Sequence, residues 1–203
     1  MFFTIVVLIL SIIVHEVAHG YAANALGDPT AKLQGRLTLN PVPHIDPVGS
    51  ILIPGLLVLT NAGMLFGWAK PVPYNPYNLR NQRWGEAIVG VAGVATNLLL
   101  AVVFALIARV AFASGADVFG GLAAVVCYVN LFLGLFNLIP FPPLDGFTVL
   151  RGLLPYRLSV SFRDIEARLG GFTGLLVFLV AFSYLFAKPF HTFVVYVFGL
   201  LVG

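Results

Sequence analysis

Charge is scarce in this sequence. Of its 203 residues, only 9% are Asp, Glu, Lys or Arg, and 60% are hydrophobic, whereas soluble domains carry about 25% charged residues. Too few charged side chains remain to coat a soluble core, and a mean hydropathy of +0.99 excludes a disordered chain. A net charge of +3 gives no basic patch of the kind that binds nucleic acid. We therefore expect an integral membrane protein that binds no nucleic acid.

Cysteine is nearly absent as well. Cys127 is the single cysteine, so an intrachain disulfide is excluded. Its neighbours are apolar, which predicts a small buried hydrophobic residue. The sequence also lacks a repeat, a low-complexity tract and a separate polar domain, so we expect one domain over residues 1–203.

Long apolar stretches are what the sequence does contain. A helix that crosses a membrane needs about 20 mostly apolar residues. The candidate stretches are Met1–Ala23, Glu86–Phe112, Val118–Ile139 and Phe172–Ala187. The tail Phe190–Gly203 is shorter and follows Lys188-Pro189, so it either continues a kinked helix or lies at the membrane interface. This pattern predicts an all-α polytopic membrane protein with about four to five transmembrane helices.

The stretch Val48–Phe66 is apolar but interrupted by Pro54-Gly55, and both residue types weaken a helix interior. Cytoplasmic loops collect Lys and Arg, and nine of the eleven basic residues flank this stretch or follow the third span. They are Lys32, Arg36, Lys70, Arg80, Arg83, Arg151, Arg157, Arg163 and Arg168. All nine lie on one side only if the stretch enters the membrane and returns. We therefore expect a re-entrant segment and an external amino terminus.

The segment Ala31–Leu39 shows partial alternation of apolar and polar residues between turn signals, which favours a short membrane-associated strand. The edge of such a strand could pair with an extended peptide. A simple connecting loop is the equal alternative.

Three ionisable residues stand close together inside the first span. His15 and His19 are four residues apart, so they share one helix face and can offer two imidazole nitrogens to one metal ion. Glu16 lies one step round the helix, and this is the H-E-x-x-H arrangement of zinc peptidases. Zinc acidifies its bound water and a carboxylate accepts the proton. The alternative is a salt-bridged helix end, but ionisable residues inside a span indicate function by default.

A catalytic zinc needs a third protein ligand. The candidates are His44, Asp46, Glu86 and Asp145. Asp145 is the best placed, because Pro140, Pro142 and Pro143 unwind the backbone just before it. With a re-entrant segment, the first and third spans run parallel, and the histidines and Asp145 then lie at the same depth. With a full crossing they would lie at opposite ends.

Two motifs together resemble a known family. HEVAHG at His15–Gly20 and NLIPFPPLDG at Asn137–Gly146 are similar to the motifs of the site-2 proteases, the intramembrane zinc metalloproteases. NPVPHIDPVGS at Asn40–Ser50 and FGWAKPVPYNP at Phe66–Pro76 are most similar to the compact branch without PDZ or CBS domains. The resemblance extends to LRGLLP at Leu150–Pro155.

The resemblance implies a role for each matching residue. His15, His19 and Asp145 would bind Zn²⁺, and Glu16 would be the catalytic base. Asn137 and Asn97 match two intramembrane asparagines of the family, which would help to position the substrate. Hydrogen bonding between helices is the stronger alternative for both, and for Asn97 above all.

We therefore expect residues 1–203 to form a single intramembrane metalloprotease domain. Such an enzyme would cleave a transmembrane or membrane-proximal segment of a membrane protein, as a multi-pass protein of the cell membrane. Two other functions fit parts of the pattern. One is a metal-binding membrane transporter, in which the two histidines and Asp145 form a transit site. The other is an inactive relative that only binds membrane helices, against which the presence of Glu16 argues.

Overall fold

The computed structural model describes residues 2–60, 68–81 and 84–203, and within these ranges the chain is helical and forms no strand. Three helices are long and apolar enough to cross a membrane: α1 (Phe2–Ala25), α4 (Gly85–Ala113) and α5 (Asp117–Asn137). They match the first three predicted spans to within two residues at each end. The structure therefore confirms an all-α polytopic membrane protein.

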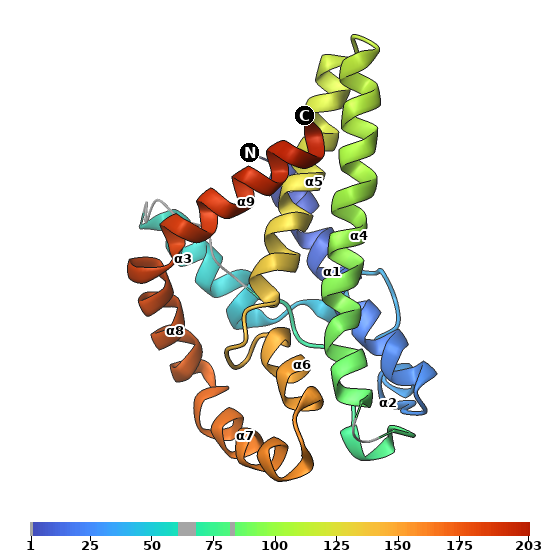
Figure 1. The fold of residues 1–203 in the computed structure, drawn as a ribbon, viewed down its shortest axis with the longest axis vertical. Helices are drawn as coiled ribbons and strands as arrows, with labels where there is room; N and C mark the ends of the chain where they lie inside the picture. The colour runs from blue at the N-terminus through green and yellow to red at the C-terminus, as the bar shows by residue number, and fades with distance from the viewer. Residues whose placement is uncertain (1, 61–67, 82–83) are drawn as a thin grey trace.

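The three long helices form the central bundle (Figure 1). α1 and α5 run in the same direction, and α4 runs opposite to both. The connection from α4 to α5 is tight because Gly115 adopts a positive φ of 76°, which favours glycine. The small side chains of Ala101, Ala105 and Ala108 are buried on α4 and let the backbones approach closely. The expected parallel arrangement of the first and third spans is present.

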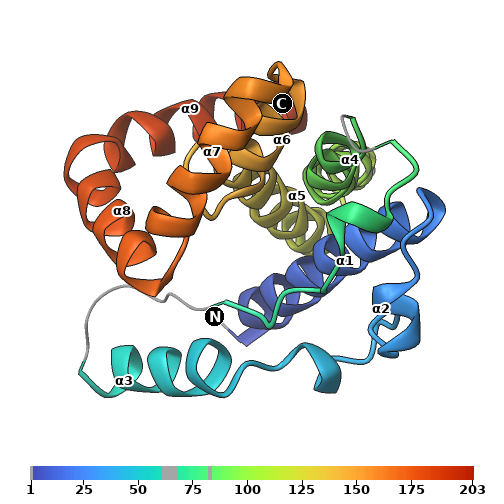
Figure 2. The ribbon, with the colours of Figure 1, turned by 90° about the horizontal axis from the view of Figure 1, so that it is seen from below.

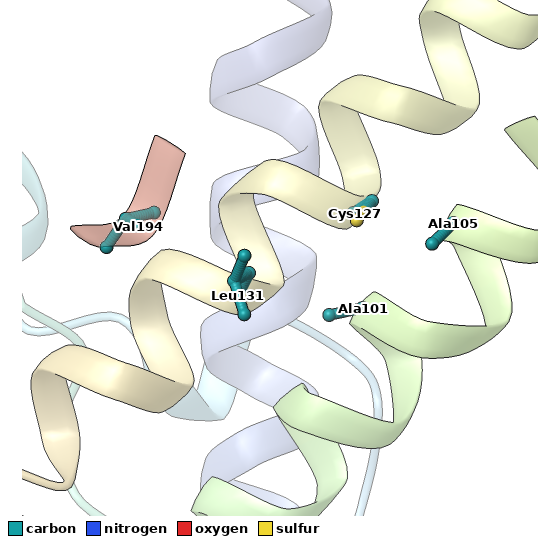
Figure 3. Close-up of a cluster of buried hydrophobic side chains, with 5 residues drawn as sticks. All are labelled: Ala101, Ala105, Cys127, Leu131 and Val194. Atoms are coloured by element: carbon teal, nitrogen blue, oxygen red, sulfur yellow. The ribbon is translucent and has the colours of Figure 1, made fainter. Parts of the chain in front are cut away.

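The C-terminal helix α9 (Ala187–Val202) lies across this bundle and packs against both α4 and α5. Figure 3 shows Val194 of α9 facing the cluster of Cys127, Leu131, Ala101 and Ala105. Cys127 is completely buried there, as expected for a small hydrophobic residue. The tail is thus a helix of its own, packed on the bundle.

The predicted fourth span, Phe172–Ala187, corresponds to α8 (Phe172–Leu185), which has 14 residues and is too short to cross alone. It follows the amphipathic helix α7 (Tyr156–Leu169). The pair Arg157–Leu169 and Gly174–Leu185 is apolar enough to count as one span, but it is bent by 89°. The described residues thus offer three spans, or four if this bent pair is one, where four to five were expected.

The apolar stretch Val48–Phe66 begins with a π-helical turn (Pro47–Leu52) and continues as α3 (Ile53–Leu59), while its residues 61–66 lie outside the described ranges. The amide of Trp68 donates to the carbonyl of Gly49 at 3.1 Å, and the hydroxyl of Ser50 donates to the carbonyl of Trp68 at 2.8 Å. A crossing segment would end about 30 Å from its start. The described residues Gly49 and Trp68, on either side of the gap, instead lie side by side, which is the arrangement expected for a re-entrant segment.

The strand predicted over Ala31–Leu39 is wrong. The chain forms the short helix α2 (Thr30–Leu33), and Gly35 then turns at a φ of 64°. The Asp28 carboxylate accepts hydrogen bonds from both the amide and the hydroxyl of Thr30. Asp28 thus closes a local turn directly before α2, and the chain follows this turn into a helix although the side chains alternate weakly.

Helix α6 (Asp145–Leu153) is fixed to the start of α4 by a buried ion-pair cluster. Arg151 of α6 pairs with Glu86 of α4 and with Glu166 of α7, and Arg163 of α7 pairs with Glu86 at 2.7 Å. Glu86 and Arg151 are only 2% and 6% exposed. The cluster joins three helices at one end of the bundle.

Replacing Arg151 with Met should destabilise the protein by about 3 kcal/mol or more, because breaking a buried pair leaves a carboxylate without its partner. The measurement is thermal or denaturant unfolding in detergent. Arg168→Met is the matched control, since Arg168 lies exposed on the same helix as Glu166 and should shift stability by less than about 0.5 kcal/mol. Equal stabilities for the two variants would contradict the role of the cluster.

Candidate metal centre

Two histidines on α1 form one side of the centre. His15 and His19 are both buried and one helical turn apart, so their rings point in the same direction from α1. Their Nε2 atoms are 3.0 Å apart. The two nitrogens are therefore close enough to bind one metal ion together.

The third group, the carboxylate of Asp145, belongs to a helix far from α1 in the sequence. Asp145 is the first residue of α6, and its Oδ2 lies 2.8 Å from His15 Nε2 while its Oδ1 lies 3.3 Å from His19 Nε2. A β-carbon on Gly146 would lie 2.1 Å from the carbonyl oxygen of Leu138. Only glycine therefore lets the proline-rich turn fold back against the start of α6 and bring the carboxylate to the histidines.

The spacing and chemistry of these three side chains fit a zinc ion. One ligand atom from each lies within 4.8 Å of the others. Zinc–nitrogen and zinc–oxygen bonds of about 2.0–2.2 Å in a tetrahedron place the ligand atoms roughly 3.3 Å apart, close to the spacings found here. The Oδ2 atom of Asp145 is buried and makes no hydrogen bond within the described part of the chain. A cation would satisfy it.

The orientation of His19 is set by α4. The carbonyl of Val89 can only accept, so His19 donates its Nδ1–H to that oxygen, at 2.6 Å. In the neutral imidazole the Nε2 atom then carries no proton, and it faces His15 and Asp145, which is how outer partners orient metal-binding histidines. No sequence pattern points to Val89, because a backbone carbonyl is the same at every residue.

Space for the two rings is provided by Gly93 on α4. A β-carbon there would lie 2.5 Å from His19 Nε2 and 2.7 Å from His15 Cε1. No side chain larger than hydrogen fits without displacing the histidines. Gly93 is thus the point at which α4 passes the centre.

Glu16 lies next to the centre but is not one of its three converging groups. Its Oε2 accepts a hydrogen bond of 2.8 Å from the amide of Val72. The side chain is partly buried. The Glu16 carboxylate is thus held by a backbone amide and lies outside the set of three groups that could bind a metal ion.

The structure separates the other candidate ligands from the centre. The ring of His44 is bound to the carbonyl of Thr38 at 2.9 Å, and Asp46 accepts the amides of Val48 and Gly49 at a helix start. Glu86 belongs to the ion-pair cluster described above. Of the four candidates for the third ligand, only Asp145 meets the histidines.

The two asparagines differ in their surroundings. Asn137, on the last turn of α5, is partly buried and donates to the carbonyl of Leu133 at 3.0 Å. Asn97 is completely buried on α4, and neither atom of its amide group has a hydrogen-bond partner among the described residues.

Comparison with known proteins gives consistent matches. The family model described as Peptidase family M50 matches residues 111–180. The protein named "Putative zinc metalloprotease YwhC" of Bacillus subtilis (strain 168) is 39% identical over 204 residues, which cover 96% of this chain and 84% of that protein. "Putative zinc metalloprotease Rip2" of Mycolicibacterium smegmatis is 30% identical over 70% of this chain and 53% of its own length. No solved structure matches the chain significantly.

Replacing Gly93 with Ala should lower bound metal at least about tenfold, because the new methyl group displaces the two imidazole rings and second-layer disruptions cost 10–100-fold in metal affinity. The measurement is metal content per chain after purification in detergent. Gly121→Ala on α5 is the matched control, since a β-carbon there meets no atom within 4 Å, and it should keep the metal. Full metal content in the Gly93 variant would contradict the close approach of α4.

Proposed function

The chain belongs to peptidase family M50, the site-2 protease family, and we propose that it cleaves a peptide bond of a membrane protein within the bilayer. It is a membrane protein and a zinc metalloprotease. The observation that carries the proposal is the convergence of His15 and His19 with Asp145 of α6, because the histidines lie on the candidate span α1. We propose residues 1–203 as a single catalytic domain in the cell membrane.

In this proposal His15, His19 and Asp145 hold the zinc ion. When bound, zinc supplies a Lewis acid that polarises the scissile carbonyl and an acidified water. Two neutral imidazoles and one carboxylate leave an open position for that water, as catalytic zinc sites do. The hydrogen bond from His19 to Val89 keeps the ring in the tautomer that can bind metal.

Glu16 acts as the general base and then as the general acid. One carboxylate oxygen is held by the amide of Val72, and the carboxylate accepts a proton from the attacking water. The water oxygen bonds to the carbonyl carbon and the carbon–nitrogen bond breaks. Glu16 returns the proton to the leaving amine, so the carboxylate is regenerated.

Asn137 and Asn97 are proposed to position the substrate, with different reach. Asn137 stands directly before the turn that carries Asp145 and is partly exposed, so its side chain can meet a substrate. Asn97 is fully buried and can act only through neighbouring groups. A substrate helix hides its amides in its own hydrogen bonds, so it must unwind before its carbonyl can meet the centre.

The test is cleavage of a model transmembrane substrate by purified protein in proteoliposomes. Glu16→Gln should lower kcat by at least about 10²-fold, because the neutral amide cannot accept the proton, while metal content stays unchanged. His15→Ala and Asp145→Ala should lose both the metal and the activity. A chelator should stop cleavage, and added zinc should restore it.

Two outcomes would contradict the proposal. Cleavage by Glu16→Gln at the wild-type rate would remove the base assignment. Uptake of zinc into the vesicles without any cleavage, and with no dependence on Glu16, would instead indicate a metal transporter.

A further inference from the structure

An extended segment crosses α1 at the candidate base. Residues 68–75, here called the strap, lie between the re-entrant segment and α4 and form no helix. Figure 2 shows this part of the chain, in blue-green, passing alongside α1. Its central residue is Val72, whose amide donates to Oε2 of Glu16 at 2.8 Å. The position of the strap therefore decides where one oxygen of the Glu16 carboxylate lies.

A buried arginine holds the strap just before Val72. Arg36 is only 6% exposed, and its Nη2 donates to the carbonyls of Lys70 at 2.7 Å and Pro71 at 3.2 Å. Within the described ranges, no carboxylate pairs with Arg36. A buried guanidinium without a carboxylate is costly, so these two carbonyls are its principal partners. The guanidinium thus fixes the two peptide units that lead into the Val72 amide.

The side chain of Val72 is seated on α1 one turn beyond Glu16. Val72 is 5% exposed, and a β-carbon on Gly20 would lie 2.8 Å from its Cγ1 and 2.5 Å from Cδ2 of Leu37. Glu16 and Gly20 are four residues apart on one helix face. The strap therefore contacts α1 twice at this point, with the Val72 amide on Glu16 and the Val72 side chain against Gly20.

A second buried group holds the strap after Val72. The Asp28 carboxylate is fully buried and accepts the Asn75 amide at 2.6 Å and the Asn78 side chain at 2.9 Å, besides its bonds from Thr30. Burial alone would raise the pKa of Asp28, but hydrogen bonds from Thr30, Asn78 and Asn75 outweigh it and hold the pKa below its usual value. Asp28 thus stays ionised and anchors the far end of the strap.

We propose that Arg36 is a positioning residue for catalysis, because it fixes the strap so that the Val72 amide orients the Glu16 carboxylate beside the metal centre. This inference rests on the proposed role of Glu16 as the base. Arg36 touches neither the candidate ligands nor Glu16 in this arrangement, so its effect passes through the backbone of Lys70, Pro71 and Val72. Loss of the guanidinium should affect the chemical step more than the metal.

The first experiment measures the strap directly. Hydrogen–deuterium exchange, followed by mass spectrometry, compares the strap amides in the full chain, in detergent with zinc present, for wild type, Arg36→Met, Arg36→Lys and Lys32→Gln. We expect at least tenfold faster exchange in Arg36→Met and a smaller increase in Arg36→Lys, which keeps a cationic donor group but not the planar fork. Lys32→Gln is the matched control, because Lys32 is exposed in the same segment. Unchanged exchange in Arg36→Met overturns the inference, whether or not the protein cleaves anything.

The second experiment tests the link to Glu16. Arg36→Met should lower kcat on the order of 10- to 100-fold, with KM and zinc content unchanged, whereas Lys32→Gln should match wild type. Glu16→Asp has a shorter side chain that cannot keep the Val72 contact, so adding Arg36→Met to it should lower kcat by less than threefold further.

A merely structural role for Arg36 gives a different pattern. It would lower zinc content and thermal stability together, and its effect would multiply with that of Glu16→Asp; either result overturns the inference. Absence of cleavage by wild-type protein, with exchange in the strap still raised by Arg36→Met, would contradict the proposed function while leaving the strap's dependence on Arg36 supported.

Discussion

The arrangement of the helices depends on two imidazoles and one carboxylate that lie together inside an apolar bundle. An unpaired ionisable group at this depth is expensive, and His15, His19 and Asp145 offset that cost only by sharing one site. The neighbouring elements make room for these three side chains or hold them in place. α4 passes with a glycine at position 93, the turn before α6 needs Gly146, and α6 is held in place by its ion pair with α4.

The basic residues have two different uses here. Nine of them are expected on the cytoplasmic side of the membrane, because they flank the stretch Val48–Phe66 or follow the third span. Three of the nine, Arg36, Arg151 and Arg163, are bound within the protein, to strap carbonyls or to carboxylates. Arginine suits both uses, since its planar fork serves several acceptors at once. In a chain with so few charges, a loop arginine is therefore a candidate structural or positioning group as well as a sign of topology.

The sequence predicted what hydrophobic length and helical periodicity determine. The three long spans and the shared face of His15 and His19 follow from such patterns, and the structure agrees with them. The preference for Asp145 rests instead on the proline-rich turn before it and the parallel spans, and the structure brings Asp145 to the two histidines. The strand over Ala31–Leu39 is wrong, because the local turn that Asp28 closes on Thr30 leads directly into α2. The carbonyl of Val89 and the amide of Val72 could not be predicted, because a backbone group carries no residue signature and its position depends on the complete fold.

The composition of the strap indicates that its backbone binds groups of the same chain and does not pair with an added strand. Pro71 and Pro73 have no amide hydrogen, so between Lys70 and Pro73 only Lys70 and Val72 can donate. Both donors are already bound, Lys70 to the carbonyl of His44 at 2.8 Å and Val72 to Glu16. Pairing with an added strand requires unbound donors along an edge, and this stretch offers none. Pro71 and Pro73 keep the backbone of the strap extended at little further entropic cost. The strap can therefore hold the Glu16 carboxylate although it belongs to neither a helix nor a sheet.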